Sequence, residues 1–160
     1  MILLTGISGT GKTTIGNLIA KKTGLKFYDA DDYHPCNNIK KMKNNIPLND
    51  NDRVDWLINL SSNIKIWQNS GEPILACSLL KESYRNFLKS RFQNLKFIFL
   101  YGSEDIIKKR IKNRSNHFFG TALLKSQFEI LETPDYGLHI NINNTPENIV
   151  GKIIKYLNVK

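Results

Sequence analysis

A glycine-rich motif close to the N-terminus constrains this 160-residue chain more than any other feature. The stretch GISGTGKTT runs from Gly6 to Thr14 and matches the pattern G-x-x-x-x-G-K-[ST]. The apolar run Ile2-Leu3-Leu4 before it suits a buried parallel strand, and apolar residues recur at helical spacing from Ile15 to Ile19 after it. A strand, a glycine turn and a helix in this order are the context in which the motif binds phosphate.

Glycines let the backbone of such a loop curl so that several N–H groups point inward, and the following helix adds the dipole of its N-terminus. We therefore predict a nucleoside-triphosphate site, with Lys12 reaching the β- and γ-phosphates and the Thr13 hydroxyl binding Mg²⁺. A tight turn that merely contains glycines is the alternative, and both flanks argue against it. The predicted nucleotide-binding residues of the loop are Gly6, Ser8, Gly9, Thr10, Gly11, Lys12, Thr13 and Thr14.

The bulk composition is that of one globular domain, which we place over residues 1–160. Apolar residues make up 41% and charged residues 23% of the chain, and no apolar run approaches the roughly 20 residues needed to cross a bilayer. A signal peptide does not fit before a phosphate loop that begins at Gly6, so we expect a cytoplasmic protein. Two cysteines, Cys36 and Cys77, make no disulfide framework.

The net charge of +9 allows two interpretations. Nucleic-acid binding requires a clustered basic patch, often with interleaved aromatic residues. The lysines here are scattered, and an enzyme that binds an anionic nucleotide and an anionic substrate also tolerates excess positive charge. We therefore predict a small-molecule substrate and no nucleic-acid partner.

Apolar strand-like runs alternate with helical stretches, which predicts an α/β domain with a parallel sheet. The expected strands are Ile2–Thr5, Lys26–Asp29, Ile74–Ser78, Lys96–Leu100 and Leu138–Ile142. The expected helices are Lys12–Lys22, Ile39–Lys43, Asp52–Asn69, Glu82–Arg91, Glu104–Lys112, Thr121–Leu131 and Glu147–Leu157.

The long middle helix carries an apolar stripe at roughly 3.6-residue spacing. We expect Asp50 or Asn51 to cap its N-terminus and Ser70-Gly71 to end it. The stripe consists of Val54, Leu57, Ile58, Ile64 and Trp67.

Ligands of parallel sheets gather at the carboxyl ends of strands, and an acidic segment, Asp29–Pro35, follows the second strand. A kinase that acts on a hydroxyl needs a carboxylate to accept or orient its proton, and Mg²⁺ needs oxygen ligands. We predict Asp31 as the base and, with Thr13, as a metal residue, while Asp29 or Asp32 holds a water on the metal. The alternative is an acidic turn that caps a helix. His34 is either a structural histidine or a substrate ligand.

Three basic groups complete the candidate site. Arg53 could clamp a carboxylate, although its spacing alone favours an exposed arginine at a helix start. Lys81 and Arg85 share a helix face after Ser78, which suits either an anionic hydroxylated substrate or a solvated face. Arg110 and Arg114 also share a face, as in a lid whose cations neutralise charge during phosphoryl transfer, or as in a simple basic helix end.

With these motifs the chain resembles the bacterial-type gluconokinases, which are small P-loop kinases related to shikimate kinases. The resemblance covers nearly the whole length and rests on GISGTGKTT, DADDYHP, PLNDNDR with Trp56, CSLLKESYR and HFFGTALLKSQFEILETP. It implies ATP-dependent phosphorylation of D-gluconate at its 6-hydroxyl, a five-stranded parallel sheet with helices on both faces, a lid at about residues 114–125 and a homodimer. It also implies catalytic roles for Asp31, Lys12, Arg110 and Arg114, and substrate contacts from Asp31, His34, Arg53, Ser78, Lys81, Arg85, His117 and Gln127.

The chain departs from this family at four points. Leu79, Asn116 and Gly120 stand where we expect alanine, glycine and lysine, and Asn141 or Asn143 stands where we expect an aspartate. Leu79 could press on the substrate pocket, and the last change affects adenine contacts. The competing functions are a related small kinase for shikimate or another sugar acid, a regulatory P-loop NTPase and a nucleotide-binding module without turnover.

Overall fold

The computed structural model describes residues 1–113 and 120–158, in which five strands form one parallel sheet. The strands are β1 (Ile2–Thr5), β2 (Phe27–Asp29), β3 (Ile74–Ala76), β4 (Lys96–Tyr101) and β5 (Leu138–Asn141), arranged in the order β2-β3-β1-β4-β5. Leu3 in β1 is in register with Leu75 in β3 and with Phe97 in β4. The predicted parallel α/β fold is confirmed.

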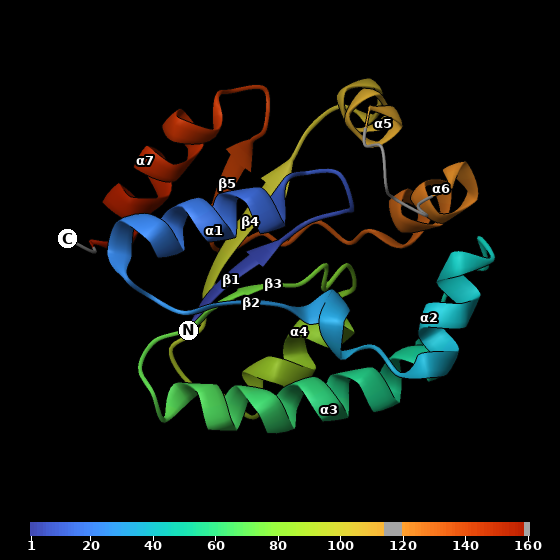
Figure 1. Cartoon of the computed structure of the whole chain (residues 1–160), viewed down its shortest axis with the longest axis horizontal. Helices are drawn as coiled ribbons and strands as arrows, with labels where there is room; N and C mark the ends of the chain where they lie inside the picture. The colour runs from blue at the N-terminus through green and yellow to red at the C-terminus, as the bar shows by residue number, and fades with distance from the viewer. Residues whose placement is uncertain (114–119, 159–160) are drawn as a thin grey trace.

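Helices cover both faces of the sheet (Figure 1). α1 (Lys12–Thr23) and α7 (Pro146–Leu157) lie over one face, and α3 (Asp50–Gln68) and α4 (Glu82–Lys89) lie over the other. Alternate residues of β1 face the two layers, because Ile2 and Leu4 belong to one core cluster and Leu3 to the other. Each layer therefore buries one face of the same strands.

The remaining helices gather beyond the carboxyl ends of the strands (Figure 1). They are the 3-10 helix η1 (Ala30–Tyr33), α2 (Cys36–Lys43), α5 (Glu104–Lys112) and α6 (Thr121–Ile130). Because β3 lies between β2 and β1, the loops that follow these three strands meet at one edge of the sheet. These are the loops in which the sequence predicts functional residues.

The start and the buried face of α3 differ from the prediction. The N-cap is Asn49, not Asp50 or Asn51, and it exchanges two hydrogen bonds with Asp52 in a capping box. Val54 and Ile58 are half exposed, whereas Trp56 and Leu60 face the core. The Trp56 indole N–H donates to the Ala30 carbonyl at 2.9 Å, which turns that side of α3 inward.

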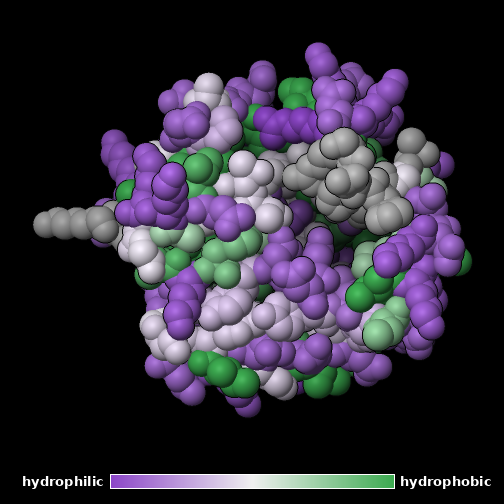
Figure 2. Space-filling model, in the orientation of Figure 1, coloured by the Kyte–Doolittle hydropathy of each residue, from purple (hydrophilic) through white to green (hydrophobic). Residues whose placement is uncertain are grey.

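The surface in the orientation of Figure 1 is mainly hydrophilic. Figure 2 shows hydrophilic residues over most of one face, with apolar residues scattered among them. In the part of the chain that the structure describes, no helix combines the length and the apolar character needed to span a bilayer.

Candidate active site

The phosphate loop joins β1 to α1 and has the backbone that its glycines predict. Gly6, Gly9 and Gly11 all have positive φ angles, of 130°, 84° and 94°. A Cβ on Gly6 would lie 2.3 Å from the Leu100 carbonyl oxygen, so glycine is also required by space. Gly11 is the N-cap of α1, whose first amides therefore face the loop, and it has no side chain to cap them.

Lys12 lies folded over this loop. Its ammonium donates to the carbonyl oxygens of Gly6 at 2.9 Å and Ile7 at 3.1 Å. The cation is thus held at the loop, where the phosphates of a nucleotide would replace these carbonyls as its partners.

A second contact ties the phosphate loop to the acidic segment after β2. The Thr13 hydroxyl donates to Asp29 at 2.6 Å, and the other carboxylate oxygen of Asp29 accepts from the Asp31 amide at 3.1 Å. A hydroxyl and a carboxylate are oxygen ligands of the kind that Mg²⁺ prefers. Within residues 1–113 and 120–158, no group of three or more histidine, cysteine or acidic side chains is placed to hold a metal. A magnesium ion would therefore depend on one or two side chains such as Thr13 and Asp29 together with waters and the phosphates, and the predicted part of Asp31 in holding the metal stays a prediction.

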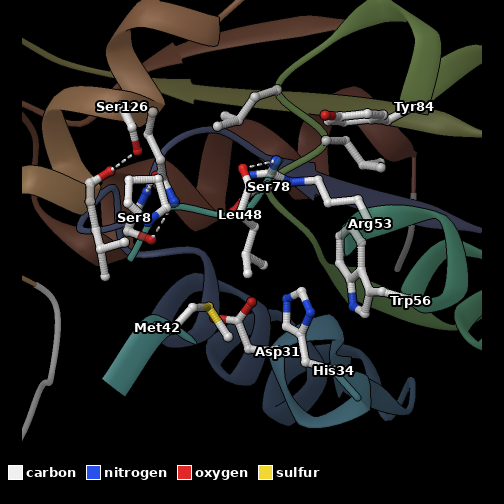
Figure 3. Close-up of a pocket in the computed structure, with 15 residues that line it drawn as sticks. Ser8, Asp31, His34, Met42, Leu48, Arg53, Trp56, Ser78, Tyr84 and Ser126 are labelled. Atoms are coloured by element: carbon white, nitrogen blue, oxygen red, sulfur yellow. Dashed lines mark hydrogen bonds between the residues drawn. The ribbon is translucent and has the colours of Figure 1, made fainter. Parts of the chain in front are cut away.

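Several predicted substrate residues line one open pocket of about 620 Å³ (Figure 3). Asp31 and His34 point into the cavity from the segment after β2, whereas Arg53 and Tyr84 point in from α3 and α4. The predicted residues that border it are Ser8, Asp31, His34, Arg53, Ser78 and Gln127. A carboxylate, an imidazole and a guanidinium therefore share one cavity beside the phosphate loop.

His34 is neutral in this pocket. Its ring stacks on Trp56 with 4.5 Å between centroids and 10° between planes. Burial, and then the positive charge of Arg53, lower the pKa of His34 to about 4.

Arg53 is positioned by the chain that leads into α3. Its guanidinium donates to the carbonyl oxygens of Leu48 and Asn49 and lies 5.6 Å from the centre of the Tyr84 ring. These contacts restrain its direction toward the cavity, where a guanidinium can bind an anion.

Lys81 borders a shallow groove that shares Leu48 and Arg53 with the pocket. Its ammonium lies 2.7 and 2.8 Å from the two carboxylate oxygens of Asp50. The Tyr84 hydroxyl also donates to Asp50, and burial together with this bond raises the pKa of Tyr84 to about 12. Lys81 is therefore paired with Asp50 at the rim of the site.

The prediction that Arg85 binds substrate is contradicted by its burial. The side chain is 1% exposed, and its guanidinium donates to Glu82 and to the carbonyl oxygens of Leu79, Leu80 and Glu132. Its charge is compensated and its donors are used within the protein. Arg85 joins α4 to the loop after β3 and to the segment after α6, and its role is structural.

A second pocket of about 660 Å³ lies on the outer side of the phosphate loop, bordered by Gly11, Thr14, Arg110, Asn144 and Pro146 among others. Arg110 donates to the Ile142 carbonyl at 2.8 Å, which ties α5 to the end of β5. Arg110 also lies beside the phosphate loop, with one guanidinium nitrogen 3.7 Å from where a Cβ on Gly11 would be, and its role toward a nucleotide stays a prediction.

The helix after the predicted lid contacts the phosphate loop directly. Gln127 in α6 accepts from the Ser8 amide at 2.7 Å, and its amide nitrogen lies 3.3 Å from the Ser8 hydroxyl. Arg114 and His117 lie outside the described residues. At the start of α6, the Gly120 amide donates to Asn45 at 2.9 Å, and a Cβ on Gly120 would lie 2.1 Å from the same oxygen. A lysine at this position would require Asn45 to move.

Leu79 and two further residues modify the expected site. Leu79 is buried at the pocket wall and has a φ of 41°, a left-handed conformation that is unfavourable for a branched side chain. Tyr84 and Asn38 are contributors that the sequence did not single out. The spacing of Tyr84 three residues after Lys81, and of Asn38 four residues after His34, was the available signal.

Comparison with known proteins identifies the family of the chain. A family model described as an AAA domain matches residues 2–118. The chain is 40% identical to a probable gluconokinase of Dictyostelium discoideum over 98% of its own length and 86% of that protein. The chain belongs to the gluconokinase family.

Two solved structures support the family assignment. A gluconokinase from Sinorhizobium meliloti superposes with a TM-score of 0.84 at 34% identity, covering 98% of this chain and 94% of that one. An unliganded sugar kinase from Janibacter superposes with a TM-score of 0.91 at 36% identity, covering 99% and 94%. The predicted P-loop kinase fold is confirmed, and a kinase of this fold uses a nucleotide as phosphate donor.

Proposed function

We propose that the protein transfers the γ-phosphoryl group of ATP to the 6-hydroxyl of D-gluconate, giving 6-phospho-D-gluconate and ADP. The observation that carries the proposal is the pocket beside the phosphate loop, which holds both the Asp31 carboxylate and the Arg53 guanidinium. The first can receive the proton of an alcohol, and the second can bind a carboxylate. A polyhydroxy acid offers both groups in one molecule.

In the proposed reaction the 6-hydroxyl lies against Asp31 and faces the phosphoryl group on the loop. Asp31 orients the hydroxyl and accepts its proton as the oxygen bonds to phosphorus. Lys12 leaves the carbonyl oxygens of Gly6 and Ile7 and binds phosphate oxygens, and Arg110 and Arg114 neutralise the developing charge. Thr13 and Asp29 would hold Mg²⁺, which when bound neutralises phosphate charge.

Arg53 provides the proposed specificity for an acid. A neutral sugar would leave the guanidinium without an anionic partner in a partly enclosed site, whereas the carboxylate of gluconate pairs with it. Lys81 adds positive charge at the rim, where Asp50 already balances it. The family resemblance also supports a single domain with a lid near residues 114–125, a homodimer and a cytoplasmic location.

The test is an ADP-release assay with gluconate, glucose, shikimate and nucleoside monophosphates as acceptors. We expect turnover with gluconate and rates near background with glucose, which lacks a carboxylate. Preferred turnover with shikimate or a nucleotide would contradict the proposal.

Asp31→Asn tests the proposed base. This variant should bind ATP normally and lose about 10²–10⁴-fold in kcat, the usual contribution of a general base. Asp32→Asn is the matched control, because it removes the neighbouring exposed carboxylate and should retain most activity. Near-normal turnover of Asp31→Asn would exclude Asp31 as the base.

A further inference from the structure

Asn38 is a buried polar residue that stands behind the pocket residue His34. It lies in α2 with 3% of its surface exposed, and its side-chain nitrogen donates to the Asp52 carbonyl oxygen at 2.7 Å. The same nitrogen lies 3.3 Å from Nδ1 of His34. A single amide group therefore contacts both the start of α3 and the imidazole.

These contacts determine where the proton of His34 lies. A backbone carbonyl oxygen only accepts hydrogen bonds, so the Asn38 atom facing Asp52 is the NH₂ group and not the amide oxygen. The second hydrogen of that NH₂ group then points to Nδ1 of His34, which must accept it with a lone pair. A neutral imidazole carries its one proton on the other nitrogen, Nε2.

The surroundings keep the ring neutral and fix its direction. Trp56 stacks on the ring, and its own N–H is bonded to Ala30, so the stacking surface cannot rotate freely. The charged groups that share the cavity are Arg53 from α3, which disfavours protonation, and Asp31 from η1. Burial, more than Arg53, lowers the pKa of His34 to about 4. The imidazole therefore carries a single N–H across the physiological pH range.

We propose that Asn38 is a positioning residue of the acceptor site: it holds His34 as the Nε2–H tautomer, and that N–H donates to a hydroxyl oxygen of the polyhydroxy acid. The inference rests on the proposed function for the nature of the acceptor. The tautomer itself follows from the contacts of Asn38 alone. His34 acts in this scheme as a hydrogen-bond donor and leaves proton acceptance to Asp31.

The tautomer is measured by long-range ¹H–¹⁵N NMR of the protein with labelled imidazoles, using His34→Gln to assign the His34 signals. In the unmodified protein we expect Nε2 protonated and Nδ1 unprotonated between pH 6 and 8. In Asn38→Asp, a carboxylate can only accept from Nδ1, so the proton should move to Nδ1 and the pKa of His34 should rise. Protonated Nδ1 in the unmodified protein would overturn the proposal, whatever the enzyme's activity.

The kinetic test compares variants that keep or remove the donor. His34→Phe preserves a stacked ring but has no N–H, and should raise KM for gluconate about tenfold, the value of one well-placed hydrogen bond. His34→Gln places an amide N–H near the position of Nε2 and should stay within a few-fold of the unmodified enzyme. Equal KM values for His34→Phe and the unmodified enzyme would overturn the proposal.

A double variant separates positioning from structural support. Asn38→Asp should raise KM and introduce a new ionisation into the pH profile of kcat/KM. Adding His34→Gln removes the imidazole and should restore the pH profile of the unmodified enzyme if Asn38 acts through the His34 proton. If the altered profile persists without the imidazole, Asn38 does not act through His34. Thermal melting and ATP binding verify that the variants are folded. An unmodified enzyme that does not phosphorylate gluconate would reject the proposed function, whereas the NMR result on the tautomer would remain valid.

Discussion

Two glycines in helix interiors, Gly16 and Gly151, differ in what surrounds them. A Cβ on Gly16 in α1 would lie 2.2 Å from the Phe27 ring, whereas a Cβ on Gly151 in α7 would meet nothing within 4 Å. Gly16→Ala should therefore destabilise the protein through overpacking that costs about 1–3 kcal/mol. Gly151→Ala should stabilise it by about 0.5–1 kcal/mol through helix propensity. Urea unfolding of both variants checks the opposite signs, and a stabilised Gly16→Ala would contradict the packing of α1 on β2.

A second residue-scale prediction concerns Asp29, which accepts from the Thr13 hydroxyl. Asp29→Asn keeps the shape and the capping capacity of the side chain and removes its charge. We expect the Mg²⁺ concentration for half-maximal activity to rise about tenfold, a factor that corresponds to 1.4 kcal/mol. Asp55→Asn, at an exposed aspartate of α3, is the control and should leave the magnesium titration unchanged. An unaltered titration in Asp29→Asn would assign the metal contact to another group.

Site residues were predictable where they belong to one continuous motif or directly follow a predicted strand. The phosphate loop is one continuous motif, and Asp31, His34 and Ser78 follow strands whose carboxyl ends meet. Arg85 was not predictable, because four-residue spacing from Lys81 places it on a helix face without showing whether that face is buried. The same holds for Asn38, whose importance comes from a contact with the distant Asp52 carbonyl.

At the scale of elements, α4 depends on Arg85 to join it to its neighbours. Arg85→Met removes a buried guanidinium and leaves the carbonyl oxygens of Leu79, Leu80 and Glu132 without these donors. We expect a loss of about 3 kcal/mol or more, measured by urea unfolding. Arg91→Ala, at an exposed arginine beyond the same helix, should change stability by less than about 0.5 kcal/mol. A variant with raised KM and unchanged stability would favour substrate binding by Arg85 instead.

Element types were predictable from periodicity, and their details depended on tertiary contacts. The five strands and seven helices of the described residues all match predicted ones, with ends that differ by a few residues. The single-turn helix η1 has too few residues to show a period. In α3, apolar residues at Val54, Trp56, Leu57 and Ile58 allow more than one buried stripe, and the Trp56 hydrogen bond to Ala30 selects one of them.

At the scale of the whole molecule, His34 makes stability depend on pH. Its pKa is about 4 in the folded protein against 6.5 unperturbed, so between these values the unfolded chain binds more protons. Stability should therefore rise as the pH increases from about 4 to 6.5, with a contribution from this group of up to about 3 kcal/mol. Urea unfolding at several pH values should show a flatter profile for His34→Gln. His139→Gln, at an exposed histidine, is the control, and an equally steep profile for His34→Gln would contradict the prediction.

The contact between Asn45 and Gly120 lies where two segments border the entrance to the pocket. Met42 of α2 and Leu123 of α6 both border the pocket, and the Asn45–Gly120 hydrogen bond joins these two helices across 75 residues of chain. A single exposed hydrogen bond of this kind contributes only about 0.5–1.5 kcal/mol, which is close to thermal energy. This link alone therefore adds little to the free energy that holds the two segments together at the rim of the cavity.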